Sequence, residues 1–530
     1  MPPSDPNILS PAPATSGDHW WKLCLIAIVA LLAFHFYRGM QRPWVEDDTW
    51  YGAVYSQAAH NNLRAGLHAA GVPATLYFGP LPIPPDAYYV HHPTLLPLLV
   101  TGSFAIVGEA EWSARLVPVL ASLASVIVLW FLVRGAAGPR AGTLAAFVFA
   151  AVPMELHYGD MVDFEPVLTL WMLAILLCLQ RWEMTANRRW AIASALFAAL
   201  ALWTDWPGYL LVLSVAASFI FARARERRWM GWMLGGLVGV AGLLFLVQIR
   251  WANAAAWSDL WSALQMRLGN AIPTSTGPIA ADAQRFTWGD WSSTVLDDLR
   301  ANYLVLTWLL VALGICWVIR RWRTDAGIRW LGWAAGQLFI ADALYVVLLR
   351  NESFIHDFAP FYLLGAIGLL GGLGLEAICC AGEKLSRVPR LGTQIGVAAL
   401  VVALGVVGFL RSEFLRTPFM ILDGIQHEPP ELIPKLGQTI DRAFPTGRTI
   451  LANFDPYGSS LTYYAQRPML TNLLTTDDWH WGIAAEHPAG GIIWLGAPGA
   501  SEILAALPGG TTRVEVAGFD FALWHAPAAP

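Results

Sequence analysis

The chain has 530 residues, of which 56% are hydrophobic and only 13% are charged, and its mean hydropathy is +0.49. This composition excludes a soluble globular protein and favours a polytopic α-helical membrane protein, in which the net charge of −5 says less than the placement of the charges. The five cysteines lie in or beside apolar runs and form no CxxC pair, so neither a disulfide framework nor a cysteine metal site is expected.

Residues 1–18 are rich in Pro, Ser and Ala and are expected to form a disordered cytoplasmic N-terminus. The apolar helix that follows starts too late and has the wrong flanks for a cleavable signal peptide, so it is expected to stay as a membrane anchor. Eleven membrane spans are predicted, at about 20–38, 114–133, 140–156, 166–181, 189–204, 207–222, 229–249, 301–319, 330–349, 358–380 and 391–411.

The placement of arginine and lysine predicts which loops face the cytoplasm. About half of the 33 basic residues cluster in short loops between predicted spans, at 134–140, 181–189, 223–228, 320–329 and 384–390. These loops all lie on one side only if the short apolar stretch 93–107 does not cross the membrane. We therefore expect 93–107 to be a re-entrant or in-plane helix on the outer face.

This topology divides the chain into an N-terminus (1–18), a transmembrane domain (19–411) and an extracytoplasmic domain (412–530). The outer loops of the transmembrane domain are then 39–113, 157–165, 250–300 and 350–357. The tail contains strand-like runs at 449–452 and 491–495 and helix-like segments, which predict a small α/β domain. No glycine-rich phosphate loop accompanies these strands, so no nucleotide site is expected.

The first outer loop carries three consecutive carboxylates, Glu46, Asp47 and Asp48, a few residues after the first predicted span. In so hydrophobic a protein, acidic side chains must lie in water, in a lined cavity or beside a cation. A solvated loop is the simplest explanation of such a run. A functional site is the alternative, and further motifs in the outer loops favour it.

A second acidic motif, 157–166 (HYGDMVDFEP), contains Asp160, Asp163 and Glu165 in a very short turn between two predicted spans. A turn this short keeps Asp163 near the bilayer surface. The structural alternative is a helix N-terminus at which Asp163 or Glu165 interacts favourably with the helix dipole.

Histidines occur in two of the outer loops. His91 and His92 directly precede the expected in-plane helix and could hold a phosphate, bind a metal or cap that helix. His356 follows Arg350 in the last outer turn, where an exposed loop histidine is the simple alternative.

Four motifs in sequence order resemble the family of dolichyl-phosphate-mannose protein mannosyltransferases and bacterial aminoarabinose (lipid A) transferases, which are glycosyltransferases of the GT-C fold. The motifs are 47–52 (DDTWYG), 92–95 (HPTL), 109–116 (EAEWSARL) and Asp163. The chain departs from the family pattern at Asp48, where a glutamate is usual, at Thr94, which replaces a proline, and at the turn 204–208. The resemblance implies a GT-C fold with about eleven transmembrane helices and an outer in-plane helix.

The resemblance also implies roles for individual residues. Asp47 is the expected general base that accepts the proton of the acceptor hydroxyl. Asp48 and Asp163 complete the expected catalytic set by orienting the acceptor or the sugar, or by holding a divalent ion. Magnesium or manganese would suit such oxygen ligands and zinc a set with histidine, and no other cofactor is expected.

Groups that stabilise a leaving phosphate must be positive or donate hydrogen bonds. The candidates for this part of the site, and for binding the rest of the substrate, are Tyr51, Arg64, His91, His92, Asp160, Arg350 and His356.

The function implied by the resemblance is sugar transfer from a polyprenyl-phosphate-linked donor to a lipid, glycan or protein acceptor on the non-cytoplasmic face of the membrane. The expected location is the bacterial inner membrane with the site facing the periplasm, and membrane lipids but no nucleic acid are expected as partners. A transporter or flippase of lipid-linked sugars is the main alternative, although no paired half-repeat is visible and most carboxylates lie in outer loops. A degenerate family member that acts as a scaffold is a further alternative, against which the intact carboxylates argue.

Overall fold

The computed structural model describes residues 18–45, 50–67, 75–252, 256–269, 286–384, 390–415, 429–454, 460–486 and 490–525. The chain divides into two compact units that are each described separately. The first unit consists of Met1–Gly39, Val90–Leu96 and Leu116–Leu415, and the second of Met40–Tyr89, Pro97–Arg115 and Arg416–Pro530.

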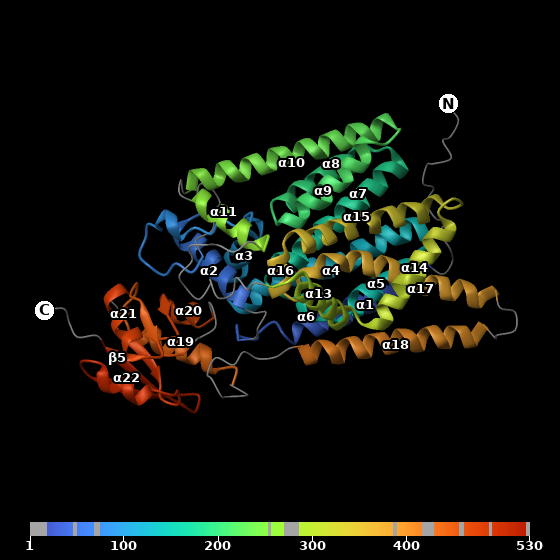
Figure 1. The fold of residues 1–530 in the computed structure, drawn as a ribbon. Helices are drawn as coiled ribbons and strands as arrows, with labels where there is room; N and C mark the ends of the chain where they lie inside the picture. Colours follow the sequence, from blue (N-terminus) through green and yellow to red (C-terminus); the bar gives the residue numbers. More distant parts are fainter. Residues whose placement is uncertain are drawn as a thin grey trace. The chain divides into compact units, whose positions relative to one another are not determined.

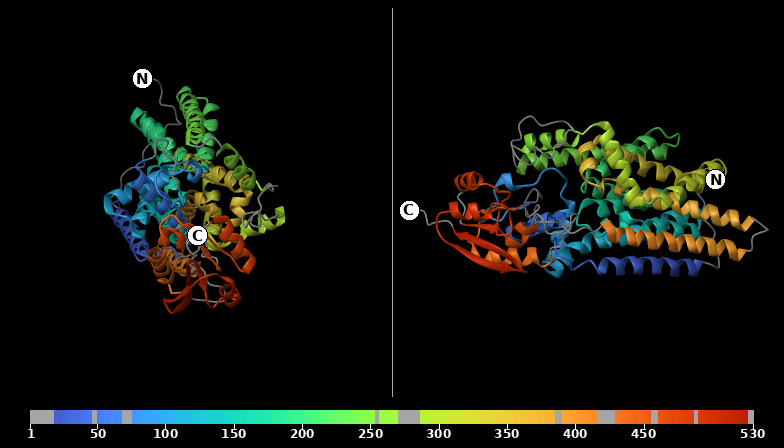
Figure 2. Two further views of the ribbon diagram at one scale, coloured as in Figure 1. Left: turned by 90° about the vertical axis from the view of Figure 1, so that its left-hand side faces the viewer. Right: turned by 60° about the horizontal axis from the view of Figure 1, so that its bottom comes forward.

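The first unit is a bundle of helices (Figure 1). In chain order its helices are α1 (Asp18–Tyr37), α4 (Glu111–Ala137, from Leu116 onward), α5 (Pro139–Ala151), α6 (Pro153–Tyr158), α7 (Phe164–Thr185), α8 (Arg188–Leu202), α9 (Trp206–Ile220), α10 (Arg225–Ala252), α11 (Ala256–Arg267), α13 (Trp288–Tyr303), α14 (Val305–Arg321), α15 (Ala326–Leu348), α16 (Arg350–Ile355), η3 (Ala359–Leu363), α17 (Leu364–Lys384) and α18 (Arg390–Leu415). The long helices run side by side, and α10 packs along α8 and α9 (Figures 1 and 2).

The prediction of a polytopic helical membrane protein is confirmed. Among the described residues, seven helices are long and apolar enough to cross a membrane, or eight if the sharply bent pair α13 and α14 forms one span. Each predicted span coincides with at least one helix of the structure. The span predicted at 140–156 is interrupted, because Val152 is extended and Pro153 starts a separate helix, α6.

Close contacts between helix backbones hold this bundle together. A Cβ atom at Gly314 of α14 would overlap the carbonyl oxygen of Leu370 in α17, and one at Gly374 of α17 would overlap the carbonyl oxygen of Leu310. Only glycine permits this approach, which is how helices in membranes gain packing contacts without a hydrophobic driving force between them.

The stretch predicted as an in-plane helix forms α3 (Leu95–Val107). Its 13 residues would extend about 20 Å at 1.5 Å per residue, which is short of the roughly 30 Å of a bilayer's hydrocarbon core. The length of α3 therefore supports the prediction that this segment does not cross the membrane, which remains a prediction.

The second unit combines α2 (Trp50–Ala65), η2 (Pro85–Ala87) and most of α3 with a C-terminal α/β domain. The elements of this domain are α19 (Leu432–Ala443), β1 (Ile450–Ala452), α20 (Ser460–Ala465), β2 (Met469–Leu470), α21 (Thr476–Glu486), β3 (Gly490–Trp494), α22 (Ala500–Ala506), β4 (Thr511–Val516) and β5 (Phe519–His525). The expected strand-like runs at 449–452 and 491–495 correspond to β1 and β3, so the predicted small C-terminal α/β domain is present.

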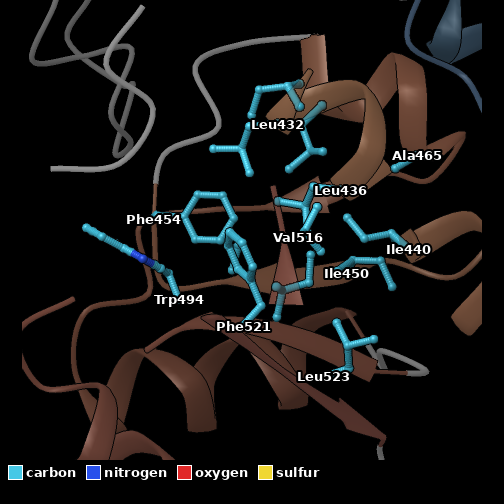
Figure 3. Packing of buried hydrophobic residues seen from close by; sticks show 14 of the residues in the cluster. Leu432, Leu436, Ile440, Ile450, Phe454, Ala465, Trp494, Val516, Phe521 and Leu523 are labelled. Carbon is cyan, nitrogen blue, oxygen red and sulfur yellow. The ribbon is translucent and has the colours of Figure 1, made fainter. Parts of the chain in front are cut away.

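The C-terminal sheet has the strand order β2-β1-β3-β5-β4. β1 pairs in parallel with β2 and β3, while β5 runs antiparallel to β3 and β4. Ala517 and Gly518 link β4 to β5 with positive φ angles of 53° and 87°, as a two-residue hairpin turn requires. One face of the sheet packs against α19 and α20 through apolar side chains that include Leu436, Ile450 and Phe521 (Figure 3).

Candidate active site

Two buried carboxylates lie at the start of α7 in the first unit. Asp163 is the N-cap residue of α7, and its Oδ1 accepts a hydrogen bond from the backbone N–H of Phe164 at 2.8 Å. Burial, with further contributions from Asp205 and Glu352, raises the pKa of Asp163 well above its usual range. Glu165 is also buried, and its Oε2 has no hydrogen-bond partner among the described residues. The predicted capping role is thus present, but capping does not account for a second buried carboxyl group beside it.

Asp205 connects two other elements of the first unit at the start of α9. Its Oδ1 lies 2.7 Å from Nδ1 of His92, and its Oδ2 accepts a hydrogen bond of 2.8 Å from the hydroxyl of Tyr362 in η3. Because a carboxylate only accepts hydrogen bonds, Nδ1 of His92 carries the proton. The His92 ring stacks on Phe164, with 4.7 Å between the ring centroids. His92 and Asp205 therefore lie next to the start of α7.

The backbone around His92 is fixed against the turn between α8 and α9. Trp206 donates from Nε1 to the carbonyl of His91, and Trp203 donates from Nε1 to the hydroxyl of Thr94. The carbonyl of Trp203 accepts a hydrogen bond from the N–H of Leu95. The backbone is therefore held at His91, before His92, and at Thr94 and Leu95, after it, and these contacts position the His92 ring.

A third group of charges surrounds Glu352 in α16. Arg267, at the end of α11, forms an ion pair with Oε2 of Glu352, and Nε2 of His356 lies 3.4 Å from Oε1. Burial lowers the pKa of His356 below its usual value, although Glu352 opposes this effect. Because the pKa of His356 lies below its usual value of 6.5, the imidazole ring is neutral at pH 7. His356 would therefore serve as a hydrogen-bonding group and not as a cation.

Arg350 and His91 attach α11 to neighbouring elements of the same unit. Arg350 donates to the carbonyl of Leu268 at 2.9 Å and lies 4.3 Å above the ring of Trp288. Nε2 of His91 lies 3.0 Å from Oδ2 of Asp259 in α11, and this contact holds the pKa of that carboxyl below its usual range.

The remaining candidates predicted from the sequence are distributed over the chain. Asp160 is buried in the turn between α6 and α7, close to Glu155. Tyr51 and Arg64 belong to α2 in the second unit, where Tyr51 is half-buried. Asp47 and Asp48 lie outside the described residues.

Arg64 makes hydrogen bonds with three groups of its own unit. It donates to Oδ1 of Asn61 at 2.8 Å and to the carbonyls of Tyr77 and Gly79 at 2.9 and 3.0 Å. These contacts connect α2 to the loop that follows it, so Arg64 has a structural role. The sequence predicted Arg64 only as a candidate for binding the substrate phosphate.

The described residues do not form a metal site. Among them, no group of three His, Cys, Asp or Glu side chains has an arrangement that could hold a metal ion. Both oxygens of Asp205 already have partners in His92 and Tyr362.

The site in the first unit includes four residues that the sequence prediction did not select: Asp205, Arg267, Glu352 and Tyr362. A signal was available for two of them. Asp205 directly follows an apolar helix and precedes Trp206-Pro207, and Glu352 shares its short turn with Arg350 and His356. Tyr362 and Arg267 carry no comparable signal, because neither belongs to a recognisable motif.

Comparisons with solved structures define the class of fold. ArnT from Cupriavidus metallidurans bound to undecaprenyl phosphate aligns with 13% identity and a TM-score of 0.58, covering 96% of this chain and 98% of that one. The archaeal oligosaccharyltransferase AglB from Archaeoglobus fulgidus, in complex with an inhibitory peptide and a dolichol-phosphate, aligns with 13% identity and a TM-score of 0.56, covering 91% of this chain and 70% of that one. A second AglB structure, a complex with zinc and sulfate, aligns with 12% identity and a TM-score of 0.56, covering 88% of this chain and 68% of that one. The chain has the GT-C fold.

A family model matches part of the sequence. Residues 91–251 match the model of the dolichyl-phosphate-mannose-protein mannosyltransferase family. The predicted resemblance to this family is thereby confirmed over a region that contains His92, Asp163 and Asp205. No curated protein sequence gives a significant match.

Proposed function

We propose that this protein is a membrane glycosyltransferase that moves one sugar from a polyprenyl-phosphate-linked donor to a lipid, glycan or protein acceptor. The observation that carries the proposal is the cluster of Asp163, Asp205 and Glu352 with His92 and Arg267 at helix ends of a GT-C fold. The family match covers three of these residues. A donor with a polyprenyl phosphate is consistent with the undecaprenyl phosphate and dolichol-phosphate named for ArnT and AglB.

The reaction needs no cofactor to balance. The oxygen of the acceptor hydroxyl forms a bond to the anomeric carbon of the sugar as the bond from that carbon to the phosphate oxygen breaks. The electron pair of the broken bond leaves with the polyprenyl phosphate, and the hydroxyl proton moves to a carboxylate. We assign this general base to Asp47, on the basis of its motif.

The remaining groups have roles that follow from their charge and position. Arg267, which forms an ion pair with Glu352, and Arg350 offer the positive charge that a leaving phosphate requires. His92 is held by Asp205 in one orientation and could donate or accept a hydrogen bond toward the sugar. Asp163 would orient the sugar or the acceptor, and its raised pKa suits a group that keeps its proton and donates a hydrogen bond.

A form of this proposal in which a divalent ion takes part in the reaction is the alternative. One AglB structure contains zinc, whereas the described residues of this chain offer no group of three ligands. Asp47 and Asp48 are the carboxylates that would have to supply ligands if an ion takes part.

We further infer that the reaction takes place at the periplasmic face of a bacterial inner membrane. The clustering of basic residues in loops on one side supports this orientation. Asp163, Asp205 and Glu352 lie at helix ends that alternate with those basic loops along the chain.

The proposal is tested with purified full-length protein, a synthetic polyprenyl-phosphate sugar and a candidate acceptor. Asp47→Asn keeps the size of the side chain but does not accept a proton at neutral pH, so turnover should fall at least about a hundredfold. Asp477→Asn, at an exposed position of α21, is the matched control and should retain full activity. Full transfer by Asp47→Asn would remove Asp47 as the base. Transport of the lipid-linked sugar with no transfer by the native protein would favour the transporter alternative.

A further inference from the structure

Tyr158, the last residue of α6, connects two turns of the first unit: the acidic turn (157–165) and the last turn (350–357). Tyr158 is buried, with 2% of its surface exposed, and its O–H donates to Oδ2 of Asp357 at 2.6 Å across 199 positions of sequence. A hydrogen bond of this length to a carboxylate is roughly twice as strong as one between neutral groups. The bond therefore ties the turn that carries Asp163 to the turn that carries His356.

Aromatic rings connect the same two turns. The ring of Tyr158 lies beside that of Phe358, with 5.7 Å between the centroids, and Phe358 stacks on His356 at 4.9 Å. Phe358 is itself buried. Ring pairs at such distances contribute more than the area they bury. Tyr158 therefore supports the last turn through its ring as well as through its hydroxyl.

Backbone hydrogen bonds hold the chain between Tyr158 and Asp163. The N–H of Met161 donates to the carbonyl of Tyr158 at 3.1 Å, and the N–H of Asp163 donates to the carbonyl of Met161 at 2.8 Å. The hydroxyl of Ser122 in α4 donates to the carbonyl of Gly159 at 2.9 Å. Because these bonds link Tyr158 to Asp163 in two steps, a displacement of Tyr158 would also displace Asp163.

Helix α13 holds the last turn from another direction. Asn302 of α13 donates from Nδ2 to the carbonyl of Asp357 at 2.9 Å. Trp291 of the same helix donates from Nε1 to Oγ of Ser353 at 2.9 Å. Asp357 is consequently bound through its side chain by α6 and through its backbone by α13.

The two turns carry different parts of the candidate active site. Asp163 belongs to the acidic turn, whereas Glu352, with its ion-pair partner Arg267, belongs to the last turn. Glu352 and Arg267 both interact electrostatically with Asp163, so the two parts lie close to each other. The distance between them depends on the contacts that join the turns.

We propose that Tyr158 and Asp357 are a pair of positioning residues that sets the separation between Asp163 and the charges around Glu352. The inference rests on the proposed function, in which arginines beside Glu352 bind the leaving phosphate and Asp163 orients the sugar or the acceptor. Transfer requires these parts of the substrates to be aligned, and a misplacement of about 1 Å can cost about a hundredfold in rate. Breaking the pair should therefore impair the transfer step more than the binding of the donor.

The test compares Tyr158→Phe with Tyr209→Phe in the purified full-length protein. Tyr158→Phe removes the hydroxyl that bonds to Asp357 and keeps the ring beside Phe358. Tyr209 of α9 is the matched control, because its hydroxyl has no hydrogen-bond partner among the described residues. We expect kcat for sugar transfer to fall by about ten- to a hundredfold in Tyr158→Phe, while KM for the donor stays within about twofold. Tyr209→Phe should behave like the native protein.

Asp357 is an exposed residue, so it supplies a second series that serves even if Tyr158→Phe does not fold. Asp357→Asn keeps an oxygen that can accept from the Tyr158 hydroxyl, whereas Asp357→Ala removes the acceptor. We expect Asp357→Ala to lose as much of kcat as Tyr158→Phe, and Asp357→Asn to retain most of the native rate. The double variant of Tyr158→Phe and Asp357→Ala should be less than about twofold slower than either single variant, because the two residues act through one bond.

Three results would overturn the inference. These are a native kcat in both Tyr158→Phe and Asp357→Ala, losses that multiply in the double variant, and a lowered Tm with unchanged kcat, which would show a purely structural role. A native protein that transfers no sugar at all would instead refute the proposed function.

Discussion

His92 and Asp205 form a hydrogen bond of 2.7 Å across 113 positions of sequence. The bond joins the segment before α3 to the start of α9, and Tyr362 occupies the other oxygen of the same carboxylate. Histidines whose Nδ1–H donates to a carboxylate have a fixed ring orientation and a fixed tautomer. This relationship makes Asp205 the residue that determines how His92 faces its surroundings.

Asp205→Asn should therefore lower turnover. An asparagine offers one acceptor oxygen and one amino group, so it cannot accept from both His92 and Tyr362. Loss of such a supporting contact typically costs about ten- to a hundredfold, which is the expected decrease in kcat. Ser214→Ala, which removes a hydroxyl that bonds within α9, is the control and should leave kcat unchanged. Native turnover in Asp205→Asn would show that the orientation of His92 has no effect on the reaction.

Asp163→Asn should make the protein more heat-stable at neutral pH. The pKa of Asp163 is raised from 3.8 by burial, so above pH 3.8 the unfolded chain releases a proton that the folded carboxyl keeps. Stability from this group is thus complete below pH 3.8 and declines as the pH rises toward the folded pKa. An asparagine has no proton to lose and still caps α7, so Tm should decline less between pH 4 and pH 8 than in the native protein. Asp163→Ala, which also loses the cap, should be less stable than Asp163→Asn at every pH.

Arg267→Gln should change the acid sensitivity of the protein through His356. The pKa of His356 lies below 6.5, so stability is lost as the pH falls from 6.5, where the unfolded histidine binds a proton that the folded one does not. Arg267 contributes to this lowering and Glu352 opposes it. The loss of Tm between pH 7 and pH 5 should therefore be smaller in Arg267→Gln and larger in Glu352→Gln. His356→Asn supplies the reference curve without this titration, and identical curves for all three variants would contradict the assignment.

Arg64→Lys distinguishes a structural role from phosphate binding in the second unit. A lysine cannot reproduce the three hydrogen bonds to Asn61, Tyr77 and Gly79, so unfolding should become easier by about 1–3 kcal/mol. KM for the donor should stay close to the native value, as measured in the transfer assay. A raised KM at unchanged Tm would favour the phosphate role predicted from the sequence.

Cysteine labelling in intact cells tests the predicted topology. The background must lack the native cysteines, because Cys316 is exposed. Single cysteines at the exposed positions Asn187 and Thr324 should be protected from a membrane-impermeant reagent, whereas those at Ser293 and Thr512 should react. Reaction at Asn187 together with protection of Ser293 would mean that α3 crosses the membrane and would contradict the placement of the site.

Much of the helical fold could be predicted from the sequence because apolar runs of membrane length carry a strong local signal. The signal weakens where a helix is short, and the predicted span at 140–156 concealed the break at Pro153. The C-terminal strands β1 and β3 were predicted from apolar runs. The grouping of the C-terminal domain with α2 was not predicted, because it depends on contacts such as that of Tyr464 with Trp44.

The site was predictable only where a residue belongs to a motif. Asp163 and His92 were selected for that reason, and the structure places both beside Phe164. Asp205 was noticed only within the turn 204–208 that departs from the family pattern, and Glu352 lies in the predicted outer loop 350–357 without a motif of its own. Asp205 contributes to the site because it contacts His92, which lies 113 positions away in the sequence. A contact between residues so far apart leaves no recognisable pattern in the local sequence.

The composition of the second unit has a consequence for biosynthesis. Its first part ends at residue 89 and its last part begins at residue 416, so every helix of the first unit except α1 is made between them. At about 5–20 residues per second, the interval is roughly 15 to 65 s. During this time α2 has left the ribosome without the helix that carries Tyr464. A chain released early would contain most of its apolar helices and still lack the helices and strands against which Val45 packs, so the second unit is completed only when translation is nearly finished.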